Sequence, residues 1–345
     1  MGAERAPGNV GGHPPTPASP GTRPAVGSLA RWLFGTLALL GVLLLPRSQG
    51  PRALTAPPTP PSDQYPAAGT DSSPADRALA AQYPAAGTDS SPADRALAAR
   101  YAPLLFFDQL EPFLPSVAGY TIFRADAPSL SFPRRVTLRP HFPQIAANDA
   151  RQIAALFPDQ QLPLVPDITA TVVIEYAIWW DWDIQHLYEL EHAWSYVGAD
   201  GQLLYAEASW HGSYFPMIWQ GATPHQGERP IIYSQPGKHA FVPDPQLFTG
   251  AVQEREALRR TCFFRAGTSG LLLKEDLFGG RIAKDSARDA IANAYLKERA
   301  FDPTFAFTRT VQIDDAMLVP WPALDAWIPS RIDQVLWNLG EWRLR

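Results

Sequence analysis

The stretch H-L-Y-E-L-E-H-A-W at residues 186–194 places two histidines and two glutamates within nine positions. The chain has only seven histidines in 345 residues, so this is a marked concentration. Asp181 and Asp183 lie just before it, in W-W-D-W-D. Carboxylates and imidazoles this close together serve as metal ligands, as catalytic acids and bases, or as the solvated face of a strand.

The secondary structure of residues 186–194 decides which of these side chains meet. On a helix, Glu189 and His192 would form the Glu-x-x-His pair of a di-metal helix bundle, which needs a second such pair. The chain has no other E-x-x-H. The sequence Gly-Ala-Asp-Gly at 198–201 is a hairpin signal, because Asp-Gly supplies the positive φ of a tight turn. The stretch is therefore predicted to be a strand.

On that strand Glu189 and Glu191 share one face, about 7 Å apart along the chain. Two carboxylates shielded from water repel each other, so one takes up a proton unless a cation lies between them. Asp181, Asp183 and His186 come from the preceding loop and could complete the coordination of an ion. An oxygen-rich set with one imidazole suits Ca²⁺, Mg²⁺ or Mn²⁺ better than Zn²⁺. The competing interpretation is a solvated sheet face.

Residues 101–345 have the pattern of a mostly β domain. The strongest predicted strand is A-T-V-V-I-E-Y-A-I-W-W (170–180), in which alternate residues from Val172 to Trp180 face one side. Further strands are predicted at 191–197, 202–210, 229–234 and 269–274, and helices at 248–260 and 285–300, the second capped by Asp285. Many short strands interrupted by proline and glycine favour a β-sandwich with helical insertions, comprising residues 92–345.

The N-terminal part is organised differently. A Pro/Gly-rich tail (1–31) precedes the uncharged segment W-L-F-G-T-L-A-L-L-G-V-L-L-L (32–45). Its length falls between that of a signal-peptide core and that of a spanning helix. Because no small-x-small cleavage site follows, we expect an uncleaved signal anchor, with a cleaved signal peptide as the alternative. Either way the domain is expected to lie outside the cytoplasm, membrane-anchored or secreted.

Residues 46–91 are predicted to be a disordered linker. The sequence Q-Y-P-A-A-G-T-D-S-S-P-A-D-R-A-L-A-A occurs at 64–81 and again, letter for letter, at 82–99. Two copies are too few for a solenoid, so the duplication indicates a lengthened linker. The second copy is predicted to begin the folded domain, because Ser91 can cap a short helix that starts at Pro92.

Composition excludes one class of partner. The net charge is −5, and from residue 101 onward 21 basic residues face 28 acidic ones, so the domain has no phosphate-binding footprint and nucleic acid is not an expected partner. The 11 tryptophans and 46% hydrophobic residues indicate a substantial core. The single cysteine, Cys262, has apolar neighbours and is predicted to be a buried hydrophobic residue.

Four motifs occur in a recognisable order. They are Y-A-P-L-L-F-F-D-Q-L-E-P-F-L-P-S (101–116), Y-E-L-E-H (188–192), W-H-G-S-Y (210–214) and P-G-K-H-A-F-V-P (236–243). The set resembles a vacuolar-protein-sorting-related family, which shows Y-A-P with E-x-x-x-P-S, then G-D-W-E-H, then G-S-H-A-x-x-P. It is more distantly similar to the necrosis- and ethylene-inducing-peptide-like proteins, which carry G-H-R-H-D-W-E, H-G-G-Y and T-H-A-F. Both resemblances imply a β-sandwich, and the second implies a divalent-cation site at one end of it.

The second resemblance implies a ligand set. His186 stands at the first histidine of the motif, Glu189 at its aspartate and Glu191 at its glutamate. Asp181 is taken as the upstream aspartate, with Asp183 competing for that role. The expected metal ligands are therefore Asp181, His186, Glu189 and Glu191.

Other residues are expected around the ion or its ligand: His239, His211, Asp183, His192 and Tyr214. The resemblance places His239 at the T-H-A-F histidine and His211 at H-G-G-Y. The alternatives are a satisfied core histidine for His239 and a backbone hydrogen bond at a strand end for His211. Lys238 replaces a small polar residue of the family and is expected to be solvated. Trp179, Trp180, Trp182 and Trp194 are expected to be core or rim aromatics, with a lipid-facing or sugar-stacking cluster as the alternative.

Three functions are consistent with these features. The favoured one is an exported, membrane-tethered, divalent-cation-binding β-sandwich that recognises a polar ligand such as a glycan or a lipid headgroup. The alternative is a metal-dependent hydrolase of an ester or phosphoester, with Glu189, Glu191 or His239 as general base. The third is a structural surface domain without a site. Because the chain has no G-x-S-x-G or other nucleophile motif, binding is preferred to catalysis.

Overall fold

A computed structural model describes residues 91–141, 165–270 and 286–343. The hydrophobic segment 32–45, the linker before residue 91, the predicted strand residues 271–274 and the predicted cap Asp285 lie outside the described residues. Among those that are described, no helix has both the length and the apolar character needed to cross a membrane.

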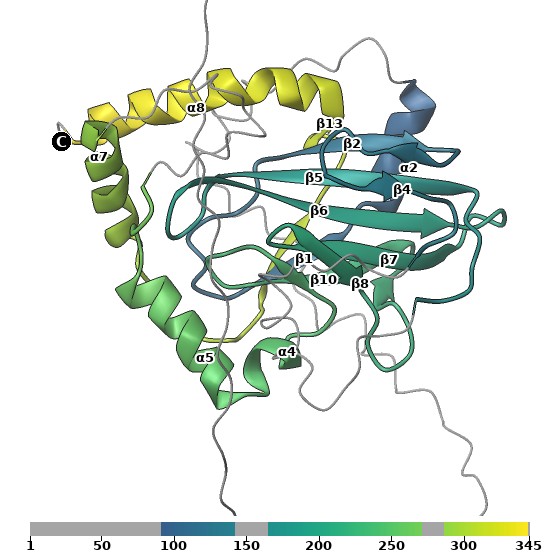
Figure 1. The fold of residues 1–345 in the computed structure, drawn as a ribbon, viewed down its shortest axis with the longest axis horizontal. Helices are drawn as coiled ribbons and strands as arrows, with labels where there is room; N and C mark the ends of the chain where they lie inside the picture. The colour runs from purple at the N-terminus through teal and green to yellow at the C-terminus, as the bar shows by residue number, and fades with distance from the viewer. Residues whose placement is uncertain (1–90, 142–164, 271–285, 344–345) are drawn as a thin grey trace, which may run out of the picture. The chain divides into compact units, whose positions relative to one another are not determined.

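Two β-sheets dominate the described part of the chain (Figure 1). In spatial order, the larger sheet contains β13 (Leu318–Pro320), β2 (Val117–Phe123), β5 (Val172–Trp182), β6 (Leu187–Val197), β7 (Leu203–Trp210) and β8 (Ser213–Pro216). Its neighbouring strands are antiparallel except for β13 and β2. The second sheet contains β11 (Phe241–Val242), β10 (Arg229–Ser234), β1 (Leu104–Phe107) and β12 (Arg309–Gln312), with β9 (His225–Gln226) beside β10. The mostly β prediction is confirmed.

The core lies between these two sheets. The indole of Trp180 on β5 lies 6.5 Å from the ring of Phe107 on β1 and 6.2 Å from that of Phe241 on β11. All three side chains are buried, and each large apolar group buried this way contributes about 1.5–3 kcal/mol. The predicted apolar face of β5 is thus confirmed as an inner face, and the β-sandwich with it.

The opposite face of β5 is covered as well. Val173 and Trp194 pack there with Phe132 and Val136, from a segment that contains the small hairpin of β3 (Ala127–Pro128) and β4 (Arg135–Val136). For this reason β5 is buried on both sides rather than alternating between core and solvent.

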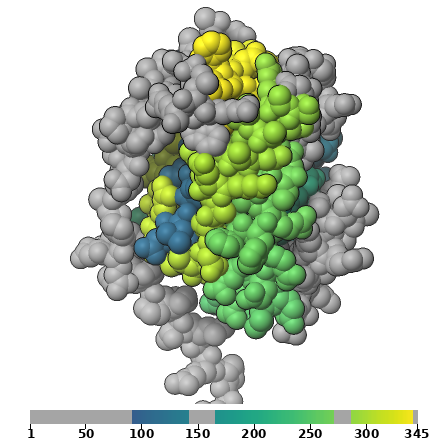
Figure 2. All heavy atoms as spheres, turned by 90° about the vertical axis from the view of Figure 1, so that its left-hand side faces the viewer, coloured from purple at the N-terminus to yellow at the C-terminus, as the bar shows by residue number. Residues whose placement is uncertain are grey.

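The described residues also contain five α-helices, and Figure 2 shows α5, α7 and α8 together on one side of the domain. They are α2 (Pro92–Tyr101), α4 (Gln246–Thr249), α5 (Val252–Arg259), α7 (Ser286–Lys297) and α8 (Trp321–Arg343), and the π-helix η2 (Arg260–Phe264) continues α5. The predicted start of α2 is confirmed, because the Ser91 hydroxyl accepts a hydrogen bond from the Asp94 amide at 3.1 Å. The helix predicted over 248–260 is interrupted at Gly250.

Two turns define the ends of the central strands. The predicted hairpin joins β6 to β7, with Gly201 at a φ of 77° and its amide donating to the Gly198 carbonyl. At the other end of β6, residues 183–186 connect it to β5, and the Asp183 amide donates to the His186 carbonyl at 2.9 Å. This tight connection fixes the positions of the acidic and histidine side chains singled out above.

Candidate metal centre

The turn between β5 and β6 is held by segments distant in sequence. The Ile184 amide donates to the Gly237 carbonyl at 2.8 Å, and the Ile184 carbonyl accepts from the Gly267 amide at 2.9 Å. The Leu187 amide donates to the Gly270 carbonyl at 2.8 Å. Because these bonds involve the backbone, the turn is anchored independently of the side chains that it carries.

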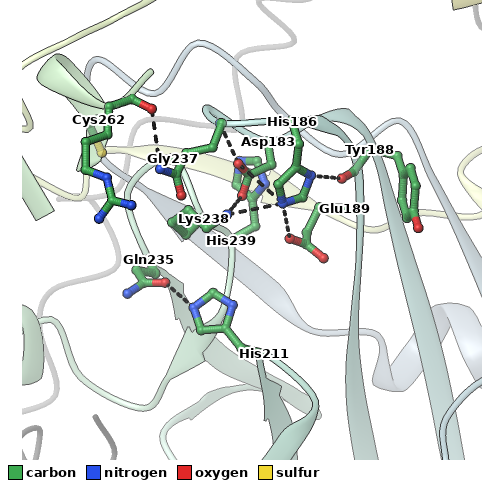
Figure 3. Close-up of polar contacts among 12 residues, drawn as sticks. Asp183, His186, Tyr188, Glu189, His211, Gln235, Gly237, Lys238, His239 and Cys262 are labelled. Carbon is green, nitrogen blue, oxygen red and sulfur yellow. Dashed lines mark hydrogen bonds and ion pairs between the residues drawn. The ribbon is translucent and has the colours of Figure 1, made fainter. Parts of the chain in front are cut away.

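Three of those side chains converge. Asp183, His186 and Glu189 each offer one ligand atom, and these atoms lie within 4.8 Å of one another. Nε2 of His186 is 3.7 Å from Oδ1 of Asp183 and 4.0 Å from Oε2 of Glu189 (Figure 3). Asp183 is fully buried, whereas the side chains of His186 and Glu189 are 13% and 11% exposed. This trio, called the candidate centre below, could hold a metal ion and is reached by solvent at one side.

A cationic side chain enters the candidate centre from the second sheet. Nζ of Lys238 forms an ion pair with Oδ2 of Asp183 and lies 3.3 Å from Nε2 of His186. Its side chain is only 14% exposed, so the prediction that Lys238 is solvated is wrong. The cause is electrostatic: carboxylates within reach of the lysine offset the cost of burying its charge.

The pKa shifts in the candidate centre reflect this ion pair. Burial alone would lower the pKa of Lys238, but the carboxylates of Asp183 and Glu189 outweigh it and raise that pKa. Burial would likewise raise the pKa of Asp183, but its electrostatic interactions with His186 and Lys238 outweigh burial and lower that pKa. Both groups therefore carry their charges at neutral pH.

The loop that carries Lys238 is tightly fixed. The amides of Lys238 and His239 both donate to the Gln235 carbonyl, at 3.1 and 2.9 Å. Gly237 has a φ of 69°, and a Cβ added there would lie 2.8 Å from Cγ2 of Ile184 and 3.0 Å from Sγ of Cys262. Only glycine fits this approach. Cys262 is buried, as predicted.

Glu191 lies beside the candidate centre but is held by other groups. Its carboxylate accepts hydrogen bonds from the Ser209 hydroxyl and, at 3.4 Å, from the His211 amide. Nε2 of His211 lies 2.8 Å from Oε1 of Gln235, and burial together with the charge of Lys238 lowers the pKa of His211. Glu191 is not one of the three converging ligands, although its charge helps to raise the pKa of Lys238.

His239 packs behind the candidate centre. It is fully buried, its ring stacks on Trp180 with centroids 4.7 Å apart, and its Nε2 lies 3.3 Å from Oε1 of Glu111. Its Nδ1 has no hydrogen-bond partner among the described residues. Glu111 also accepts the Gly237 amide at 2.6 Å. Glu111 was not predicted as a site residue, although it opens the E-x-x-x-P-S motif at 111–116.

Asp181 is directed elsewhere. Its carboxylate accepts two hydrogen bonds from the Arg331 guanidinium on α8, at 2.9 and 2.7 Å, and one from the Trp179 indole at 3.1 Å. The upstream acid that reaches the candidate centre is instead Asp183, the competitor considered from the sequence. Asp181 is still part of β5, whose successive side chains point to opposite faces of the sheet, whereas Asp183 follows Trp182, the last residue of that strand.

His192 and Tyr214 lie on the outer face of the large sheet. The ring of His192 is 4.9 Å from that of Phe132, and the ring of Tyr214 is 5.6 Å from that of Trp194. The expected separation of His192 from Glu189 by strand alternation is observed. Neither residue contributes to the candidate centre.

Backbone strain is concentrated near the candidate centre. Five non-glycine residues of the described chain have positive φ angles, and three of them are Tyr188, His211 and His239, at 50°, 51° and 66°. Such conformations cost about 1–2 kcal/mol per residue and tend to persist at functional sites.

No protein-family model, curated protein or solved structure matches this chain. The functional argument therefore rests on the geometry of the candidate centre.

Proposed function

We propose that the folded domain is a divalent-cation-binding module that uses its ion to recognise a polar ligand. The observation that carries the proposal is the approach of Asp183, His186 and Glu189 to within 4.8 Å of one another. Two carboxylates and one imidazole, partly open to solvent, form an incomplete coordination shell.

The ligand types favour a hard ion. Two carboxylates on a sandwich interior repel each other, and a doubly charged cation neutralises both. Ca²⁺, Mg²⁺ and Mn²⁺ accept mixed oxygen and imidazole ligands, and Ca²⁺ takes 6–8 ligands in a flexible geometry. With three protein ligands, the remaining positions are available to water or to a bound ligand.

The ligand would be a hydroxyl-rich or anionic group, such as a glycan or a lipid headgroup. Support comes from the partial exposure of His186 and Glu189, through which such a group could reach an ion held by the candidate centre. The hydrophobic segment 32–45 would tether the domain at a membrane, outside the cytoplasm.

Binding is better supported than hydrolysis. A general base must reach an ion-bound water with a free basic atom. Glu189 belongs to the converging trio, Glu191 is engaged by Ser209, and His239 is fully buried against Trp180. Glu189 is partly exposed but would be occupied as a ligand, so none of the three combines a free basic atom with access to solvent.

The test is equilibrium dialysis of the full-length chain against Ca²⁺, Mg²⁺ and Mn²⁺, followed by elemental analysis. We expect a single bound ion, and a loss of affinity of about tenfold or more, or about 1.4 kcal/mol, in Asp183→Asn and Glu189→Gln. Asp333→Asn, which removes an exposed carboxylate on α8, is the matched control and should bind like wild type.

Two results would contradict the proposal. One is the absence of a bound divalent ion in the folded wild-type protein. The other is unchanged affinity in Glu189→Gln, a partly exposed position at which circular dichroism can verify folding. Vesicles and glycan arrays with and without chelator then identify the ligand class.

A further inference from the structure

We infer that Lys238 is a built-in competitor for the candidate centre: its ammonium occupies the cation position, and an incoming divalent ion must displace it. This inference rests on the proposed cation-binding function and concerns how that function is regulated. Its starting point is that the cation position already contains a positive charge.

The ammonium contacts two of the three residues that an ion would need. Nζ of Lys238 pairs with Oδ2 of Asp183 and lies 3.3 Å from Nε2 of His186. Both residues belong to the trio that could hold a metal ion. Figure 3 shows Lys238 directed toward Asp183 and His186, so an ion held by these residues would lie beside Nζ, and we expect the two cations to exclude each other.

Charge leads to the same conclusion. Asp183 and Glu189 bring two negative charges, and the ammonium of Lys238 neutralises one of them. A divalent ion alone neutralises both, so the ammonium is then not needed to balance Asp183 and Glu189. Like charges a few ångströms apart in a partly buried site repel strongly, so the ammonium has to leave.

The side chain can leave without rearrangement of its loop. The backbone of Lys238 is fixed by its hydrogen bond to Gln235 and by the close packing of Gly237 against Ile184. The four-carbon stem of lysine has rotatable bonds that the backbone does not restrain. Lys238 is 14% exposed, and His186 beside it is 13% exposed, which provides a path to solvent.

Tethering makes this competition selective. Because the ammonium is attached to the protein, its effective concentration at the candidate centre is high. Free monovalent ions interact more weakly with the carboxylates and do not displace it. A divalent ion gains more from the two carboxylates and can replace it. The apparent dissociation constant for the ion then equals the intrinsic constant divided by the fraction of molecules in which Lys238 has left the cation position.

The first experiment compares ion affinities by calorimetric titration of the full-length chain with Ca²⁺ and Mn²⁺. Lys238→Met keeps the stem and removes the charge, and we expect an apparent affinity at least about tenfold higher than in wild type. Lys297→Met, at an exposed position on α7, is the matched control and should leave the affinity unchanged.

The second experiment uses the wild-type protein, so it does not depend on a variant that folds. The chain has four lysines, and acetylation of each by an amine-reactive reagent can be followed by peptide mass spectrometry. Lys238 should react slowly without ions and faster once a divalent ion is added. Lys297 serves as the exposed internal control and should react equally in both conditions.

The outcomes separate the two proposals. Suppose that wild type binds an ion, that Lys238→Met binds it with the same affinity, and that the ion does not change the acetylation of Lys238. The role of Lys238 as a competitor is then refuted, whereas the cation site is supported. If neither wild type nor Lys238→Met binds an ion, both are refuted. Higher affinity in Lys238→Met with ion-dependent acetylation in wild type supports both.

Discussion

The carboxylate of Asp181 and the guanidinium of Arg331 form a two-bond ion pair between β5 and α8, across 150 residues of sequence. Arg331 is almost completely buried, and Asp181 is partly exposed. The pair fastens the long C-terminal helix to the large sheet and keeps Asp181 away from the candidate centre.

Replacing Asp181 should therefore affect stability rather than ion binding. In Asp181→Asn the buried guanidinium of Arg331 loses its counter-charge, which we expect to cost about 2–4 kcal/mol of unfolding free energy. Urea unfolding measures that loss, and dialysis should find ion affinity within about twofold of wild type. A large loss of affinity in a folded Asp181→Asn protein would place Asp181 at the ion after all.

The outer face of the large sheet contains a second buried ion pair, between Arg134 and Glu207 at 2.8 Å. The guanidinium also lies over the rings of Trp194 and Tyr214, at 4.4 and 3.8 Å from their centroids. Arg134→Ala leaves Glu207 buried without its counter-charge and should destabilise the fold by about 3–5 kcal/mol.

Thermal or urea unfolding of Arg134→Ala tests this expectation. The neighbouring Arg135 is exposed, and Arg135→Ala should change stability by less than about 0.5 kcal/mol. Added guanidinium ion at low, non-denaturing concentration should partly restore Arg134→Ala, because the cavity retains its aromatic walls and its carboxylate. Equal stabilities for the two variants would mean that the buried pair contributes nothing.

Glu175 gives the fold a predictable pH dependence. Burial raises its pKa, although hydrogen bonds from Ser131, Trp194 and Ser129 and the charge of Arg134 oppose the shift. A carboxyl with a raised pKa binds more protons in the folded state than in the unfolded state, so its contribution to stability falls as pH rises above the ordinary glutamate value of about 4.3.

Glu175→Gln removes this titration. The unfolding free energy of wild type relative to Glu175→Gln should therefore decrease between about pH 4 and pH 7. Urea unfolding across this pH range provides the measurement. A difference that is constant with pH, or that grows toward neutrality, would show that the hydrogen bonds prevail and that the pKa is not raised.

The duplicated sequence allows a clean deletion. Removing residues 82–99 joins the first copy directly to Arg100, so the helix cap, the first helical proline and all residues of α2 before Arg100 are regenerated. Because the domain then has an unchanged sequence, its melting temperature should match that of the full chain. Calorimetry would detect a shift, and a clear one would mean that the first copy contacts the domain.

Much of the fold could be predicted from local patterns. Alternation identified β5, and the Asp-Gly turn identified the β6–β7 hairpin, because both depend on residues adjacent in sequence. No element was predicted for residues 321–343, which form α8 and include Pro329. Yet its buried residues Leu324, Ile328, Ile332, Val335 and Leu339 follow a helical spacing that outweighs one proline.

The composition of the candidate centre was only partly predictable. His186 and Glu189 converge, but the choice between Asp181 and Asp183 depends on where the alternation of β5 ends, which spacing does not determine. The burial of Lys238 arises from an acid 55 positions earlier in the chain, so no local pattern indicates it. Contacts between segments distant in sequence determine which acid joins the candidate centre and whether Lys238 is buried.

The candidate centre and the lysine that pairs with it belong to different sheets. Asp183, His186 and Glu189 belong to the turn and strand of the large sheet, whereas Lys238 belongs to the loop between β10 and β11 of the other. In the ion-free domain this salt bridge is a crosslink between the layers. Exchange of the ammonium for an ion would break this salt bridge, and the backbone hydrogen bond from Ile184 to Gly237 would then be left to join the same turn and loop.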